Sequence, residues 1–301
     1  MQNTADTASL ILILKQREEH SVTASLHSNQ GGPKPQADFV ATKKGAQEDS
    51  SQGEAAQEET AQEHRSDVKS IFHRGLGTRL ILSFGQFVSR LLIKIRFEGQ
   101  ENLPSTGAFI LAPNHVSYFD AMWATLALPK TRRFDWHALA GADLWTNYGR
   151  LGRFLMRVGA AIPVDRSGRS ISGILTAKRC LDEGHILLIH PEGTRSQDGY
   201  VAQLHGGSAL LSRQAEVPII PCYLDGAYEI FGRHQRLPKP WRSFFKRKEL
   251  VIRYQSALKP ENFRSSRQMT EVLFKSLQEM DLNRLTLSER PSRNHSNEAA
   301  K

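Results

Sequence analysis

The sequence predicts an α/β fold in which a mixed sheet is flanked by helices and preceded by an amphipathic helix. Apolar runs of strand length alternate with helical patterns over most of the chain, an order typical of a sheet with helices on its faces. The chain has 301 residues, 39% of them hydrophobic, and only two cysteines, Cys180 and Cys222. It can therefore form a core of its own, with no disulfide or metal framework.

The folded domain is expected to span residues 67–285. Residues 1–66 are dominated by Gln, Glu, Ser, Ala, Gly and Lys and carry six basic against ten acidic side chains. Such a segment buries too little apolar surface to offset the entropy lost on ordering. Residues 286–301 form a similarly polar tail. Both ends are therefore predicted to be disordered.

The first predicted element is an amphipathic helix within residues 67–95. Its apolar positions recur at helical spacing, and basic side chains lie on another face. The helix either packs on the domain or lies in a lipid headgroup layer as a membrane-interface helix. Further apolar residues, among them Leu82 and Ile93, widen the apolar face and favour the lipid alternative. The repeating apolar positions are Leu76, Leu80, Phe84, Phe87, Val88, Leu91 and Ile95.

Strands and helices then alternate. Buried strands are indicated by short apolar runs, and helices by longer periodic stretches. The predicted strands are 109–112, 186–189, 217–223 and 250–254, and the predicted helices are 171–182, 206–214 and 266–280.

The positive charge belongs to the domain. Residues 67–301 carry 34 basic against 21 acidic side chains. This excess indicates an anionic partner: a nucleic acid, a membrane surface or a phosphorylated substrate. Residues 234–248 interleave aromatic rings with cations and contain no acid. That composition suits an anionic bilayer, single-stranded nucleic acid or a plain solvated loop.

His115 and Asp120 directly follow the strand 109–112. Five residues are 140° around an ideal helix, so the two side chains meet only if a turn folds Asp120 back onto His115. The carboxylate would then hold one imidazole nitrogen and leave the other to accept a proton from a substrate hydroxyl. A chance spacing of the two residue types is the competing interpretation.

Two further loops carry candidate ligands. Residues 190–196, His-Pro-Glu-Gly-Thr-Arg-Ser, follow the strand 186–189, and residues 159–167 end an apolar run on Asp165 and Arg166. A guanidinium suits phosphate oxygens and a carboxylate suits hydroxyls. An exposed turn with local ion pairs explains either loop equally simply.

Several catalytic classes find no match in the chain. Residues 168–172, Gly-Arg-Ser-Ile-Ser, lack the second glycine of a hydrolase nucleophile elbow. No phosphate-binding Gly-Lys-Ser/Thr loop, H-E-x-x-H or EF-hand pattern occurs. Serine hydrolases, phosphoryl transferases and metalloproteases are therefore disfavoured.

Taken in order, four blocks resemble the 1-acylglycerol-3-phosphate acyltransferase family of glycerolipid acyltransferases. They are Asn114-His115 with Asp120, residues 159–166, residues 191–196, and Val217-Pro218-Ile219-Ile220-Pro221. The resemblance covers roughly residues 95–260. It implies an acyltransferase-like α/β fold docked at a membrane, in a pathway of phospholipid biosynthesis, with no metal or organic cofactor.

The resemblance also implies the reaction and the site. A fatty acyl group would pass from acyl-CoA or acyl carrier protein to the free hydroxyl of a lysophospholipid, foremost 1-acylglycerol-3-phosphate. His115 would be the general base and Asp120 its orienting carboxylate. The ligands of glycerol phosphate would be Arg166, Glu192, Gly193, Thr194 and Arg195.

Two departures from the family pattern leave alternatives open. His190 stands where the family usually has an aromatic residue, and His205 where a lysine commonly precedes a glycine. His190 would alter local packing, whereas His205 can hold phosphate only when protonated, which leaves a glycolipid or amino-acid lipid as an alternative acceptor. The alternatives of another class are a noncatalytic membrane-binding module and, with less support, a nucleic-acid binder.

A peripheral location at the cytoplasmic face of a membrane is expected. The apolar run 10–14 is too short for a membrane span or a secretory signal. Acyl carriers are made on the cytoplasmic side, where such an enzyme would meet both its donor and an anionic membrane surface.

Overall fold

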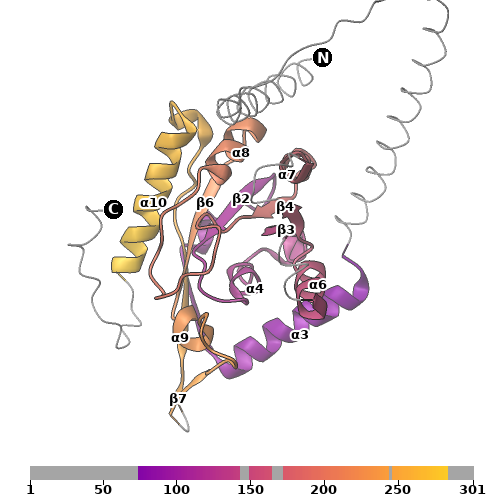
Figure 1. Cartoon of the computed structure of the whole chain (residues 1–301), viewed down its shortest axis with the longest axis vertical. Coiled ribbons are helices and arrows are strands. Elements are labelled where there is room, and N and C mark those ends of the chain that lie inside the picture. The colour runs from indigo at the N-terminus through magenta and orange to yellow at the C-terminus, as the bar shows by residue number, and fades with distance from the viewer. Residues whose placement is uncertain (1–73, 143–148, 165–171, 244–245, 284–301) are drawn as a thin grey trace, which may run out of the picture. The chain divides into compact units, whose positions relative to one another are not determined.

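Helices cover both faces of a seven-stranded sheet in the computed structural model of the chain (Figure 1). The structure describes residues 74–142, 149–164, 172–243 and 246–283, which lie in one compact unit. The predicted segments 1–66 and 286–301 lie outside the described residues. In sheet order the strands are β1 (Lys94–Glu98), β9 (Glu249–Tyr254), β6 (Ile219–Asp225), β2 (Phe109–Pro113), β5 (Ile186–Leu188), β3 (Trp136–Gly141) and β4 (Ile162–Val164).

The sheet is mixed. Neighbouring strands from β6 through β2, β5 and β3 to β4 are parallel. β9 runs antiparallel to β6, and β1 lies parallel to β9. The predicted mixed sheet flanked by helices is therefore confirmed. Because five strands share one direction, their carboxyl ends meet at one edge of the sheet, where ligand sites form in such folds.

β2 is the centre of the core. All five of its residues are buried, as expected of a parallel strand covered on both faces. Phe109 and Leu111 pack on one face with α4 (Asp120–Ala124), and Ile110 and Ala112 pack on the other. The second face is covered by α7 (Ser172–Asp182), α8 (Gly207–Ala215) and α10 (Ser266–Leu282).

The first described helix is shorter than predicted. α3 spans Leu76–Leu92, and Ile95 lies in β1 instead of continuing the helix. The correction has a local cause, because residues 93–97, Ile-Lys-Ile-Arg-Phe, alternate apolar and charged side chains with the two-residue period of a strand. Among the described residues, no helix has the length and apolarity needed to cross a bilayer.

α3 turns much of its apolar surface to solvent. Its domain side consists of Leu82, Gln86 and Ser89, which are buried. Arg133 donates to Gln86 Oε1, and the Ser89 hydroxyl accepts from the indole N–H of Trp123. The opposite side has large hydrophobic residues that are 45–73% exposed: Leu76, Leu80, Ile81, Phe84, Phe87 and Leu91.

Several short elements were not predicted. β3 and α4 have no strong apolar period, and α9 (Ala227–Phe231) is a single turn. α6 (Gly149–Val158) was overlooked although its sequence has a clear helical period, with apolar residues at positions i, i+3, i+4 and i+7: Leu151, Phe154, Leu155 and Val158. The cationic segment contains a hairpin of β7 (Trp241–Ser243) and β8 (Lys246–Arg247). The strand predicted at 217–223 begins two residues later, as β6. Short 3-10 helices occur at Gln100–Asn102, Lys130–Arg132 and Pro260–Asn262.

Candidate active site

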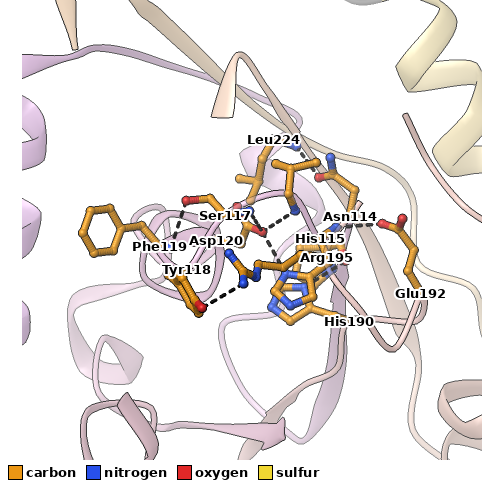
Figure 2. A network of polar contacts seen from close by, with 12 residues as sticks. Asn114, His115, Ser117, Tyr118, Phe119, Asp120, His190, Glu192, Arg195 and Leu224 are labelled. Carbon is orange, nitrogen blue, oxygen red and sulfur yellow. Dashed lines mark hydrogen bonds and ion pairs between the residues drawn. The ribbon is translucent and has the colours of Figure 1, made fainter. Parts of the chain in front are cut away.

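The candidate site lies at the carboxyl ends of β2 and β5. The loop after β2 carries His115 and leads into α4, which begins at Asp120, and the loop after β5 carries His190, Glu192 and Arg195. β2 and β5 are parallel neighbours, so their following loops start side by side. Figure 2 shows the side chains of both loops together. The structure thus joins two of the predicted blocks in one place.

A tight turn brings His115 and Asp120 into contact. His115 Nδ1 lies 3.0 Å from Asp120 Oδ2. The same carboxylate oxygen accepts the main-chain N–H groups of Val116 at 2.6 Å and Ser117 at 2.7 Å. The turn that the spacing required is therefore present (Figure 2). The His115 side chain is 21% exposed, so its ring remains reachable from solvent while its carboxylate partner is buried.

Burial sets the acidity of Asp120. The side chain is fully buried, and Oδ1 has no hydrogen-bond partner within the described structure. The loss of solvent raises the pKa of Asp120 to about 7, while the Ser117 and Val116 N–H groups and the Arg195 guanidinium act to lower it. The carboxyl group therefore titrates near neutral pH.

His190 stacks on His115. The ring centroids are 3.8 Å apart and the planes differ by 12°. His190 Nδ1 lies 3.3 Å from the carbonyl oxygen of Pro113. Burial lowers the pKa of His190 to about 3, and the nearby His115 acts in the same direction. His190 is therefore uncharged at physiological pH and supports the His115 ring by stacking.

The two rings and Asp120 also bring potential metal-ligand atoms within 4.8 Å of one another. A ring nitrogen binds a metal through a lone pair in the ring plane. Rings stacked face to face direct these lone pairs along parallel planes, so at least one would have to rotate to share an ion. The observed arrangement suits a supported base better than a metal centre.

Glu192 is held inside the protein by the main chain. The side chain is 2% exposed. Its Oε1 accepts the N–H of His115 at 2.7 Å, and its Oε2 accepts the N–H of Ala202 at 2.9 Å. Burial raises the pKa of Glu192 to about 8, against the effect of the two N–H donors. The structure thus places the predicted hydroxyl ligand behind His115, where its oxygens already have partners.

Gly193 and Thr194 form the turn that follows. Gly193 has φ +68°, which favours glycine, and a Cβ atom there would lie 2.9 Å from Cδ2 of His205. Thr194 is exposed. The glycine therefore allows His205 to pack against the turn, and the threonine hydroxyl stays available to a ligand.

Arg195 lies over Tyr118. The guanidinium carbon is 3.6 Å from the ring centroid, and a terminal nitrogen donates to the Tyr118 hydroxyl at 2.8 Å. This arrangement fixes a cation beside the His115 loop, as Figure 2 shows. The other predicted phosphate ligand, Arg166, falls outside the described residues.

Sequence reasoning missed three residues that organise the site. Asn114 Oδ1 accepts the N–H of Leu224, which joins the diverging ends of β2 and β6. Tyr118 supports Arg195, and His190 supports His115. Each lies within two residues of a predicted residue in the sequence, yet its partner comes from the other loop or strand. Spacing within one segment therefore could not reveal them.

Comparisons with known proteins identify chains that are similar in sequence. Residues 94–225 match the family model described as Acyltransferase. The chain is 28% identical over 132 residues to 1-acyl-sn-glycerol-3-phosphate acyltransferase of Bacillus subtilis, covering 44% of this chain and 63% of that protein. It is 25% identical over 167 residues to the alpha form of Mus musculus, covering 52% and 54%. The resemblance drawn from the sequence motifs is confirmed.

The fold has a solved counterpart. The crystal structure of the 1-acyl-sn-glycerophosphate acyltransferase PlsC from Thermotoga maritima aligns with a TM-score of 0.53 and 19% identity, covering 74% of this chain and 82% of that one. This likeness supports the fold. The matched region spans about half to three fifths of the length of the curated relatives named above.

Proposed function

We propose that this chain, whose residues 94–225 match the acyltransferase family model, transfers a fatty acyl group from a thioester carrier to a lysophospholipid hydroxyl. The observation that carries the proposal is the contact between His115 and the buried Asp120 at the carboxyl end of β2. The names of the relatives support 1-acylglycerol-3-phosphate as the acceptor and phosphatidic acid as the product. Acyl-CoA and acyl carrier protein are the candidate donors.

The geometry supports direct transfer with His115 as the base. Asp120 accepts a hydrogen bond from Nδ1–H of His115, leaving Nε2 to take the proton of the acceptor hydroxyl. The hydroxyl oxygen attacks the thioester carbonyl carbon, the C–S bond breaks, and the thiolate recovers the proton from His115. The products are an ester and a free thiol. A thioester is already activated, so alignment and proton removal supply most of the acceleration.

Arg195 and Thr194 are the described groups that suit the acceptor phosphate. Arg195 presents its charge beside the His115 loop, held by Tyr118. A guanidinium forms paired hydrogen bonds with phosphate oxygens. His205 favours the second candidate, a less anionic glycolipid or amino-acid lipid, because an exposed histidine stands where the family commonly has lysine. We place the phosphate acceptor first because Arg195 and Arg166 are both present.

The test measures thiol release and ester formation from acyl-CoA and acyl carrier protein, with lysophosphatidic acid and a glycolipid as alternative acceptors. His115→Ala should reduce turnover by about 10²- to 10⁴-fold. His185→Ala is the matched control, because it removes another histidine that contacts a carboxylate, Asp135, at the amino ends of β3 and β5. Equal loss in both variants, or full activity in His115→Ala, would reject the assignment.

We also propose that the domain works at an anionic membrane surface on the cytoplasmic side. The exposed apolar side of α3 supports this, as does Trp241 in β7, which is 53% exposed. Arg247 donates to the carbonyl oxygens of Arg90 and Leu91, so the hairpin adjoins the end of α3. Exposed aromatic rings and cations together suit a headgroup layer.

Vesicle sedimentation tests the membrane proposal. Full-length protein should bind phosphatidylglycerol-containing vesicles more tightly than neutral ones, and added salt should weaken the binding. Replacing Phe84 and Phe87 with serine should remove most of the bound fraction. Leu210→Ser on α8, on the other face of the sheet, is the control and should bind as the wild type does. Equal binding by all three proteins would refute the assigned surface.

A further inference from the structure

The feature that carries a further inference is the pair of main-chain bonds on Glu192. Each carboxylate oxygen has one N–H donor, from His115 on one side and from Ala202 on the other. The side chain is 2% exposed. An acceptor hydroxyl would have to reach a remaining lone pair through protein that excludes solvent. The position of Glu192 therefore argues against direct contact with substrate.

The loop that contains Glu192 also holds His115 by other contacts. The N–H of Ser196 donates to the carbonyl oxygen of His115 at 2.7 Å. The His190 ring stacks on the His115 ring. The loop after β5 thus holds the main-chain N–H, the main-chain carbonyl and the ring of His115. Asp120 contacts the ring nitrogen Nδ1 of the same histidine.

The support continues to the far side of the sheet. Val201, which precedes Ala202, donates its N–H to Asp281 Oδ2 at 3.2 Å, and the Tyr223 hydroxyl lies 2.5 Å from Asp281 Oδ1. Asp281 is on α10 and Tyr223 is on β6. Two buried carboxyl groups therefore connect the closing helix, through residues 201–202, to the main chain of His115.

From these contacts we propose that Glu192 is a positioning residue that fixes the main chain of His115 and does not bind the acceptor. The assignment rests on the proposed function, because it concerns the base of that reaction. It replaces the expectation that Glu192 accepts hydrogen bonds from acceptor hydroxyls. Thr194, exposed in the same loop, remains the group available to the acceptor.

Glu192→Gln separates the two roles. Glutamine has the same shape, but its single oxygen can accept only one of the two N–H groups, and its NH₂ then faces the other donor. A shifted His115 should lower kcat by about tenfold to a hundredfold, because reaction rates fall steeply with misplacement of a catalytic group. The acceptor KM should stay within about twofold of the wild-type value.

Thr194→Val is the matched comparison from the same turn. It should raise the acceptor KM and leave kcat nearly unchanged, which is the reverse of the effect expected for Glu192→Gln. Circular dichroism melting accompanies each variant. Should Glu192→Gln melt below the assay temperature, Glu192→Asp replaces it, since the shorter acid keeps the carboxyl group but cannot span both N–H groups. A raised acceptor KM at unchanged kcat in either Glu192 variant would overturn the inference.

A second measurement does not depend on turnover. Diethyl pyrocarbonate modification of His115, followed by peptide mass spectrometry, reports the setting of its ring in substrate-free protein. Glu192→Gln should change the modification rate of His115 while that of His185 stays the same. Absence of acyl transfer by the wild type would reject the proposed function alone. An unchanged His115 rate in folded Glu192→Gln would reject the positioning role.

Discussion

Replacing Asp120 with asparagine should abolish transfer and, at alkaline pH, stabilise the fold. The carboxyl group is fully buried, one of its oxygens has no partner in the described structure, and its pKa is raised to about 7. Asparagine retains an oxygen that can accept the N–H groups of Val116 and Ser117. It carries no charge, so it does not incur the cost of burying one.

The magnitude follows from the two pKa values of Asp120, about 7 in the folded protein and the usual 3.8 in the unfolded chain. A raised folded-state pKa gives stability that is complete below about pH 4 and is lost as the pH rises through about 7. Each pH unit in that window changes the free energy of unfolding by about 1.4 kcal/mol. Relative to wild type, the variant should therefore gain roughly 3 kcal/mol between pH 5 and pH 8.

Urea unfolding at pH 5 and pH 8 measures this gain. The buried amide adds a pH-independent cost of about 1–3 kcal/mol, which cancels when the two pH values are compared. Transfer activity should fall about 10²- to 10⁴-fold, because a neutral amide no longer stabilises the protonated His115. A stability difference that is equal at both pH values would refute the titration near neutral pH. Retained activity would refute the orienting role.

Three further outcomes test the surroundings of the base. His190→Phe keeps a ring on His115 and should change kcat by less than about threefold, whereas His190→Ala should lower it up to about tenfold in steady-state assays. Tyr118→Phe keeps the ring under Arg195 but removes the 2.8 Å hydrogen bond, so the acceptor KM should rise about fivefold; an unchanged KM would remove Arg195 from the acceptor site. Gly193→Ala, at φ +68° and facing His205, should lower the free energy of unfolding by about 1–3 kcal/mol, while Gly207→Ala, with open space around its Cβ position, should not.

The sequence predicted the central strands well because their apolar runs are continuous. Residues 109–112 and 186–189 could be assigned from composition, and the helix 266–280 from its period. The end of α3 was misplaced because residues 93–95 fit both a helical and an alternating pattern. β3 was missed because its residues show neither period strongly, whereas the helical spacing of the apolar residues in α6 was present and overlooked.

The sequence predicted contacts within a single loop of the site but not the contacts between its loops. His115 and Asp120 could be paired because both belong to one short turn. The orientation of Glu192 could not be predicted, because its partners, His115 and Ala202, are 77 and 10 residues away in the sequence. A carboxylate within a polar turn is typical of an exposed ligand group, and the burial of Glu192 is evident only in the fold. The role of Arg166 stays a prediction.

The pairing of β1 with β9 has a consequence for the order of assembly. β1 lies at the edge of the sheet, and its one neighbour there is β9, about 155 residues later in the chain. Closing so long a loop is slow, and β9 leaves the ribosome long after β1. β1, the first strand in the described part of the chain, is therefore among the last of these strands to dock. Until β9 has been made, the sheet lacks the partner strand of β1. During that time the exposed apolar residues of α3 are already part of the nascent chain.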